Sequence, residues 1–94
     1  RTVHAGDTAA QAHETMTNIA VLVDGANELT DAGIFSMQTL QYKVYVRHPR
    51  DIRVIREVMA QRLPHDAAIT YLQADICRSD LLVEIEAAGS PVPA

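Results

Sequence analysis

Apolar and acidic positions alternate near the C-terminus, in the stretch Leu82-Val83-Glu84-Ile85-Glu86. Val83 and Ile85 fall on one face and the two glutamates on the other, and this period of two is typical of a half-buried β-strand. A carboxylate held among leucine, valine and isoleucine is expected to be partly desolvated, and desolvation raises the pKa of a carboxylic acid. Glu84 is therefore a candidate for proton transfer, with Glu86 beside it.

Periodicity predicts four further elements along the chain. These are a helix over 8–25, a strand over 37–47, a helix over 50–62 and a strand over 67–75. Thr8 and Gln11 have the spacing of a capping box, and Gly25 is placed as a helix C-cap. The alternation is irregular before Tyr42, which predicts a β-bulge there. Residues 1–5 are expected to be the end of a strand whose beginning is absent.

This order of elements predicts an α+β fold, in which two helices cover one face of a mixed sheet and leave the other face open. The face under the helices is expected to carry Val44, Val46, Leu72, Val83 and Ile85. The open face is expected to carry Lys43, Tyr45, Arg47, Tyr71, Gln73, Glu84 and Glu86. Cations and hydroxyls suit an anionic ligand, and carboxylates suit proton transfer. The same residues are also compatible with a sheet face that is merely solvated.

Composition limits the kind of protein that this sequence encodes. With 94 residues, the chain is expected to form one small domain over 1–88 and a disordered tail over 89–94. The net charge of −4 argues against a nucleic-acid partner, and no apolar run reaches the length of a membrane span. We therefore expect a cytoplasmic protein without a membrane partner. Cys77 is the only cysteine, which fits a reducing compartment or a small buried thiol, and the scattered histidines predict no metal site.

The run ending in Leu-Leu-Val-Glu-Ile-Glu-Ala resembles the last strand of the RidA/YjgF superfamily, the reactive-intermediate deaminases. Within that superfamily the chain is similar to the C-terminal domains of chorismatases, enzymes of secondary metabolism that act on chorismate. The similarity extends over 43–47, the following helix, Tyr71-Leu72 and Asp75-Ile76-Cys77-Arg78. It implies a RidA/YjgF-like (chorismate-mutase-like) fold for 1–88, as the C-terminal part of a catalytic domain that lacks its N-terminal strands here.

The resemblance to chorismatases also implies a reaction and a set of site residues. Glu84 matches the glutamate that protonates the enolpyruvyl group of chorismate, in a reaction that releases pyruvate and needs no cofactor. Cys77, expected with Glu84 in the catalytic group, matches the position at which cysteine accompanies 3-hydroxybenzoate as product, whereas alanine accompanies a dihydroxycyclohexadiene carboxylate. The residues expected to bind substrate are Lys43, Tyr45, Arg47, Tyr71, Gln73 and Glu86. The site is expected to lie between this domain and the remainder of the polypeptide or neighbouring subunits of a trimeric or pseudo-trimeric barrel.

Two alternative functions are also compatible with the sequence. A RidA-type enamine or imine deaminase holds its substrate carboxylate with an arginine about fifteen positions before the glutamate. The corresponding residue here is Ile69, which binds no carboxylate, and the position two further on, often cysteine in deaminases, is Tyr71. The other alternative is a non-catalytic trimeric binding module with the same fold.

Overall fold

A computed structural model describes residues 7–29, 35–76 and 81–89 of the chain. The elements in order are α1 (Thr8–Glu28), β1 (Gln41–Val46), the 3₁₀ turn η1 (Pro49–Asp51), α2 (Ile52–Arg62), β2 (Ala68–Gln73) and β3 (Val83–Ala88). The sheet order is β2-β1-β3, with β1 parallel to β2 and antiparallel to β3. The strand end predicted over 1–5 and residues 90–94 of the tail predicted over 89–94 lie outside the described residues.

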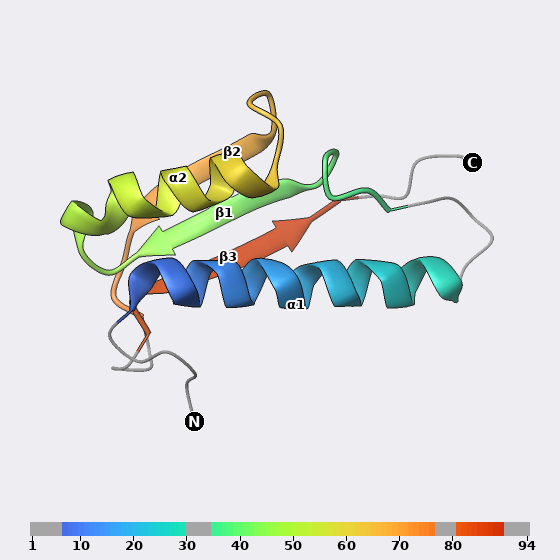
Figure 1. Ribbon diagram of the computed structural model, residues 1–94, viewed down its shortest axis with the longest axis horizontal. Helices are drawn as coiled ribbons and strands as arrows, with labels where there is room; N and C mark the ends of the chain where they lie inside the picture. Colours follow the sequence, from blue (N-terminus) through green and yellow to red (C-terminus); the bar gives the residue numbers. More distant parts are fainter. Residues whose placement is uncertain (1–6, 30–34, 77–80, 90–94) are drawn as a thin grey trace.

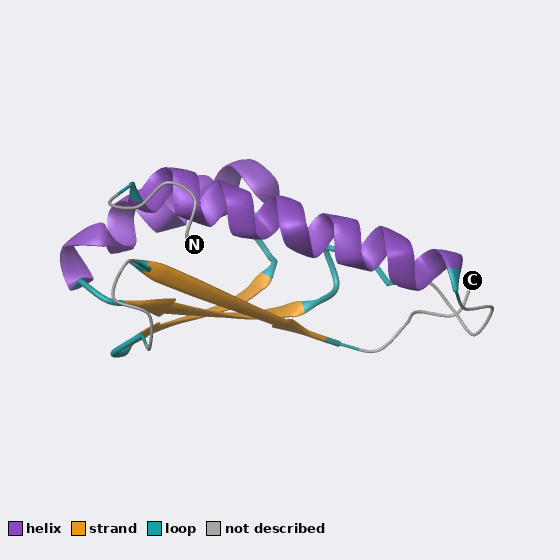
Figure 2. Cartoon of the chain, turned by 90° about the horizontal axis from the view of Figure 1, so that it is seen from below, coloured by secondary structure: helices purple, strands orange, loops and turns teal. Residues whose placement is uncertain are grey.

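The two helices form one layer and the sheet forms the other, as Figures 1 and 2 show. α1 packs along β3 and against α2, while α2 lies over β1 and β2. The predicted α+β architecture, a mixed sheet with helices on one face, is confirmed. None of the helices in the described part of the chain combines the length and apolar content needed to cross a bilayer.

Helix α1 begins at Thr8 as predicted, but its N-cap and its C-terminal end differ from the prediction. Its N-cap is Asp7, whose side chain accepts a hydrogen bond from the Ala10 amide at 3.0 Å, so the capping box was wrong. Gly25 is not a C-cap, because the helix continues to Glu28. The extra turn is stabilised by Asn27, whose side-chain amide forms two hydrogen bonds with the backbone of Phe35, at 2.7 and 2.9 Å. These bonds offset the cost of about 1 kcal/mol that glycine imposes inside a helix.

The first strand is shorter than predicted, because the irregular stretch before Tyr42 is a turn and not a bulge. The backbone amides of Thr39 and Leu40 both donate to the Ser36 carbonyl oxygen, at 3.1 and 3.2 Å. Tyr42 then enters the core with its ring 1% exposed, and its hydroxyl donates to the Met37 carbonyl oxygen at 2.6 Å. The core between the layers comprises Ala12, Met16, Leu40, Tyr42, Val44, Val46, Ile55, Val58, Met59, Leu63 and Val83.

The two faces of β2 are the reverse of the prediction. Val44 pairs with Tyr71 and Tyr45 pairs with Leu72, so Tyr71 lies on the helix side and Leu72 on the open side. Gln73 pairs with Val46 and shares the helix side by register. Both alternating sets of residues in β2 contain apolar side chains, so the sequence alone does not show which face is buried. Packing of Ile69 and Tyr71 against the core decides the orientation of the strand.

Arg62 of α2 forms three hydrogen bonds with His13 and Thr17 of α1, a group of contacts called the Arg62 latch below. Its Nε donates to His13 Nδ1 at 3.2 Å, and one terminal nitrogen donates to the His13 carbonyl oxygen at 3.0 Å and Thr17 Oγ1 at 2.7 Å. The planar guanidinium makes these bonds from adjacent nitrogens, a geometry that a lysine ammonium does not reproduce.

We expect Arg62→Lys to lower the free energy of unfolding by about 1–2 kcal/mol, because two or more of these hydrogen bonds are lost while the charge is kept. Chemical denaturation measures the change. Arg53→Lys on the exposed face of the same helix is the matched control and is expected to change stability by less than about 0.5 kcal/mol. Equal effects of the two substitutions would contradict the latch.

Candidate functional site

The open face of the sheet brings two carboxylates beside a tyrosine and a lysine. Tyr45 on β1 is directly opposite Glu84 on β3, and Lys43 is directly opposite Glu86. The Tyr45 hydroxyl donates a hydrogen bond to Glu86 Oε2 at 3.0 Å, diagonally across the strand pair. Alternation along both strands puts these four side chains on the face that the helices leave uncovered.

The Tyr45 phenol responds to both glutamates. Its pKa is raised above 10.0, mainly because its hydroxyl donates to Glu86, with smaller contributions from burial and from the negative charges of Glu86 and Glu84. A carboxylate that accepts the phenolic proton in a hydrogen bond stabilises the neutral phenol, and nearby negative charge disfavours the phenolate. The negative charges of both carboxylates therefore disfavour ionisation of the Tyr45 hydroxyl.

This coupling predicts a pH dependence with a definite sign. A phenol pKa that is higher in the folded than in the unfolded chain contributes stability that is present below pH 10.0 and is lost as the pH rises through the folded value. Spectrophotometric titration, with the Tyr45→Phe variant subtracted, isolates the Tyr45 phenolate. We expect its midpoint to lie above 10.0 and to move down in Glu86→Gln, because the charge-assisted acceptor is removed. An unchanged midpoint in Glu86→Gln would mean that the hydrogen bond does not form in solution.

Glu84 is exposed in the described part of the chain, so the partial desolvation expected from its apolar neighbours is not provided by this chain. The physical reason lies in the geometry of a strand. Val83 and Ile85 flank Glu84 in sequence but point to the opposite face, under the helices. Sequence neighbours therefore do not enclose the carboxylate, and only a surface packed on the open face can remove water from it.

Arg47 makes backbone contacts at both ends of the segment that contains Cys77. Its Nε donates to the Leu81 carbonyl oxygen at 2.8 Å, and a terminal nitrogen donates to the Ile76 carbonyl oxygen at 2.7 Å. These two carbonyls lie on either side of residues 77–80 in the sequence. Arg47 therefore links the segment that follows β2 to the residues just before β3. Its predicted role in substrate binding stays a prediction, and Cys77 itself lies outside the described residues.

Tyr71 and Gln73 do not join the open-face group, in contrast to the prediction. Tyr71 lines a groove of about 320 Å³ between α2 and the edge strand β2, and the Arg56 guanidinium carbon lies 5.8 Å from the centre of its ring. Burial raises the pKa of the Tyr71 phenol, and the positive charge of Arg56 partly opposes this shift. Because Tyr71 and Glu84 are on opposite faces of one sheet, one ligand in contact with this chain alone does not touch both.

Two features of the site are not predictable from the sequence pattern. Leu72 lies on the open face opposite Tyr45, so the candidate site has an apolar neighbour as well as charges. Gln11, 3% exposed, accepts a hydrogen bond from the Leu82 amide through its side-chain oxygen at 2.8 Å and so ties α1 to the start of β3. No local signal identifies that contact, because the two residues are 71 positions apart. Within the described ranges no three His, Cys, Asp or Glu side chains are grouped as a metal site.

Comparison with known proteins defines the fold class first. No protein-family model matches the sequence. The chain superposes on a YjgF-family protein from Neisseria meningitidis with a TM-score of 0.67 at 20% identity, over 89% of this chain and 68% of that chain. The chain therefore has a YjgF-type fold, with an open sheet face that carries paired carboxylates.

Higher identity connects the chain to chorismatases. A chorismatase crystal structure matches with a TM-score of 0.81 and 37% identity, over 93% of this chain and 27% of that chain. A chorismatase from Streptomyces rapamycinicus is 44% identical over 89 residues, and a 3-hydroxybenzoate synthase from Streptomyces hygroscopicus is 42% identical over the same length. The chain spans about a quarter, 26%, of each of these two relatives. The predicted resemblance to a segment of chorismatases is confirmed.

Proposed function

We propose that this chain is part of a chorismatase and supplies the acid that protonates chorismate. The observation that supports the proposal is the 44% identity of this chain to a chorismatase over 89 residues. Glu84, directly opposite Tyr45 on an open sheet face, is the candidate acid. Because the chain spans 26% of that relative, the proposal concerns the whole enzyme and not these residues alone.

In the proposed reaction, the protonated Glu84 carboxyl delivers its proton to the methylene carbon of the enolpyruvyl group. The adjacent ether carbon becomes an oxocarbenium-like centre, which water or a hydroxyl of the substrate attacks, and pyruvate is expelled. Water that attacks this carbon forms a hemiketal, which collapses with cleavage of the bond between that carbon and the ring oxygen, giving pyruvate and a dihydroxycyclohexadiene carboxylate. A substrate hydroxyl that attacks instead forms a cyclic ketal. Cleavage of that hydroxyl's bond to the ring, with loss of a ring proton, makes the ring aromatic, and the remaining hemiketal collapses to pyruvate and 3-hydroxybenzoate. Atoms balance in both cases without a cofactor.

The Glu84 carboxyl must be protonated before it can act as an acid. In this chain Glu84 is exposed, so the protonated form is favoured only when another surface packs on the open sheet face. A surface that excludes water from the face would favour the neutral form of a carboxyl there, because desolvation disfavours charge. Tyr45 holds Glu86 through a 3.0 Å hydrogen bond, which fixes a second carboxylate near the first. We infer that the covering surface belongs to the remainder of the polypeptide or to a neighbouring subunit, with Lys43 placed to receive the anionic substrate.

The product branch rests on Cys77 and on the 3-hydroxybenzoate synthase that is 42% identical to this chain. We propose 3-hydroxybenzoate as the main aromatic product. The sequence offers Cys77 no evident base partner, so we assign it a steric or polar role in steering the intermediate and not that of a nucleophile. The cytoplasmic location expected from the sequence stays a prediction.

Incubation of the full-length protein with chorismate, followed by chromatographic separation and a pyruvate assay, tests the proposal. We expect pyruvate and 3-hydroxybenzoate in equal amounts. Pyruvate with the dihydroxycyclohexadiene carboxylate would keep the class of enzyme and change the branch. Release of ammonia from 2-aminoacrylate without turnover of chorismate would replace the proposal with a deaminase, and no turnover of either compound would favour a binding module.

A further inference from the structure

The connection between β2 and β3 crosses the end of β1. In the sheet order β2-β1-β3, β2 and β3 lie on opposite sides of β1, and β2 runs parallel to β1 whereas β3 runs antiparallel to it. The chain that leaves β2 must therefore pass the C-terminal end of β1 before β3 begins. Arg47 is the residue that follows β1, so it lies at this crossing.

Arg47 holds the connection on both sides of the crossing. Its backbone amide donates to the Leu82 carbonyl oxygen at 3.1 Å, and its Nε donates to the Leu81 carbonyl oxygen at 2.8 Å. A terminal nitrogen donates at 2.7 Å to the carbonyl oxygen of Ile76, a residue that is 7% exposed. Hydrogen bonds from a charged donor are roughly twice as strong as those between neutral groups. Together the three bonds fix the point at which the chain enters β3.

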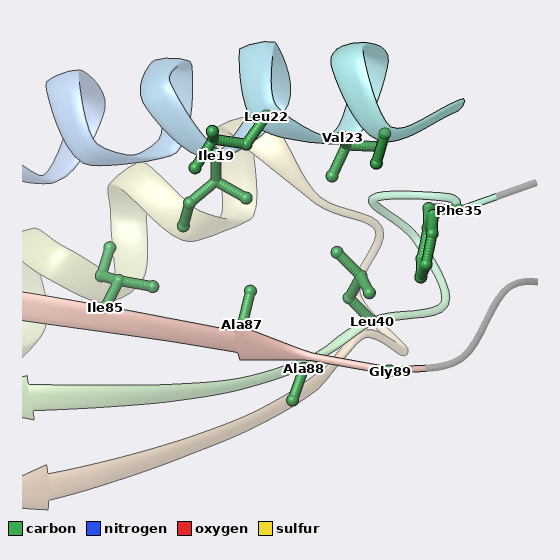
Figure 3. A pocket seen from close by; sticks show the side chains of 10 residues that line it. Ile19, Leu22, Val23, Phe35, Leu40, Ile85, Ala87, Ala88 and Gly89 are labelled. Atoms are coloured by element: carbon green, nitrogen blue, oxygen red, sulfur yellow. The ribbon is translucent and has the colours of Figure 1, made fainter. Parts of the chain in front are cut away.

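The sequence of β3 does not by itself specify the register of this strand against β1. Val83-Glu84 and Ile85-Glu86 repeat the same apolar and acidic pattern, so a shift of two residues keeps each side chain on its face. Figure 3 shows Ile85 and Ala87 pointing toward α1. Both line an apolar groove of about 500 Å³ between α1 and the end of β3, so packing there leaves room for a shifted strand.

We propose that Arg47 is a positioning residue, which sets the register of β3 and thereby places Glu84 opposite Tyr45. In the observed register these two residues are directly opposite. A shift of two residues in one direction would place Glu86 opposite Tyr45, and a shift in the other direction would place Leu82 there. Because Glu84 is the proposed acid, this role rests on the proposed function, whereas the register itself does not depend on it. The role differs from substrate binding by Arg47.

Lysine at position 47 does not reproduce this arrangement. A guanidinium donates from Nε and from a terminal nitrogen in fixed directions, so one side chain reaches the carbonyl oxygens of both Ile76 and Leu81. An ammonium keeps the charge but is a single compact donor group. Arg50 is exposed three positions further along the chain, so Arg50→Lys is the matched control for Arg47→Lys.

Disulfide trapping in the full-length protein reports the register directly. Gln41 and Ala88 are directly opposite, so the Cα atoms of cysteines there are about 5.5 Å apart in the observed register, within reach of a disulfide. Cysteine pairs at 43 and 88 or at 41 and 86 become opposite only after a shift of two residues, which span about 6.8 Å along a strand. With Arg47 intact, we expect the 41–88 crosslink alone.

In Arg47→Lys we expect the yield of the 41–88 crosslink to fall at least about threefold and one of the two shifted crosslinks to form. Arg50→Lys is expected to behave as the unaltered protein. An undiminished 41–88 crosslink in Arg47→Lys would overturn the proposal. Loss of that crosslink without either shifted crosslink would also overturn it, because Arg47 would then stabilise β3 without setting its register.

Steady-state kinetics separate positioning from substrate binding. We expect Arg47→Lys to lower kcat for pyruvate release from chorismate at least about tenfold and to change KM by less than about threefold, because the acid is displaced while substrate contacts remain. A higher KM with unchanged kcat would overturn the proposal, since Arg47 would then bind the substrate. If the unaltered protein does not act on chorismate, the proposed function fails, and the crosslinks still decide the register.

A measurement on the unaltered full-length protein applies if Arg47→Lys does not fold. A side-chain N–H in a persistent hydrogen bond is protected from exchange with solvent. We expect the Nε–H of Arg47 to exchange at least about 100-fold more slowly than the Nε–H of the exposed Arg50, because only the first donates to the Leu81 carbonyl oxygen. Equal exchange rates would overturn the proposal.

Discussion

Glu84→Gln is expected to lower pyruvate release from chorismate by about 10²–10⁴-fold in the full-length protein, the range typical of a lost general acid. Glutamine keeps the size and hydrogen-bonding reach of the side chain but carries no proton of suitable acidity. Because Glu84 is exposed and its flanking residues Val83 and Ile85 pack on the other face, we expect the folded structure to be unchanged. Circular dichroism and the thermal midpoint check that point, and a pyruvate assay measures the rate.

Glu86→Gln is the matched control for this experiment. Glu86 lies two positions further along the same strand and face, and its carboxylate accepts the Tyr45 hydrogen bond at 3.0 Å. We expect a loss of about tenfold or less, because the substitution alters the setting of the acid and leaves the acid in place. Comparable losses in both variants would mean that the two glutamates act together as the acid and that Glu84 does not act alone. Full activity in Glu84→Gln would refute the proposed mechanism.

Ile55→Ala is expected to lower the free energy of unfolding by about 2–5 kcal/mol, the range for removing a large aliphatic side chain from a core. Ile55 is 0% exposed and lies on the face of α2 that packs on the sheet. Its loss leaves a cavity that the helix and sheet only partly close. Small domains have total stabilities of about 5–15 kcal/mol, so the variant is expected to be partly unfolded at moderate temperature.

Val54→Ala is the neighbouring control, since Val54 is 38% exposed on the same helix. We expect a change within about 0.5 kcal/mol, as for most surface substitutions. Denaturant titrations of both variants measure the difference in unfolding free energy. A large effect at Val54 would mean that this face of α2 is covered in the whole protein, and a small effect at Ile55 would mean that the core is not packed as described.

Much of the fold was predictable because local periodicity was strong. The stripe on α2 was anticipated by Ile52, Ile55, Met59 and Leu63, three of which are buried and one partly buried. The alternation of β3 and of the second half of β1 was also predicted in the correct phase, as Val44, Val46 and Val83 show. The C-terminal end of α1 was not predicted, because the Asn27 side chain stabilises an extra turn through two hydrogen bonds with the backbone of Phe35.

The candidate site was only partly predictable. The open face carries four residues that were expected there, Lys43, Tyr45, Glu84 and Glu86. Their positions were predictable because every second residue of β1 and β3 is apolar and marks the buried face. Tyr71 and Gln73 were expected with them but are on the other face. The prediction failed because both alternating sets of residues in β2 contain apolar side chains. The expected desolvation of Glu84 was wrong for this chain, since apolar neighbours in sequence point away from it.

The sequence by itself determined the number and kind of elements, the acidic strand and the similarity to chorismatases, because these depend on residue types at short and regular spacings. Only the tertiary structure decided which face of β2 meets the helices, that Tyr45 donates to Glu86, and that β3 ends the described sheet with an apolar groove beside it. Such features depend on strand register and on contacts between residues far apart in the chain. A pattern read along one strand does not contain that information.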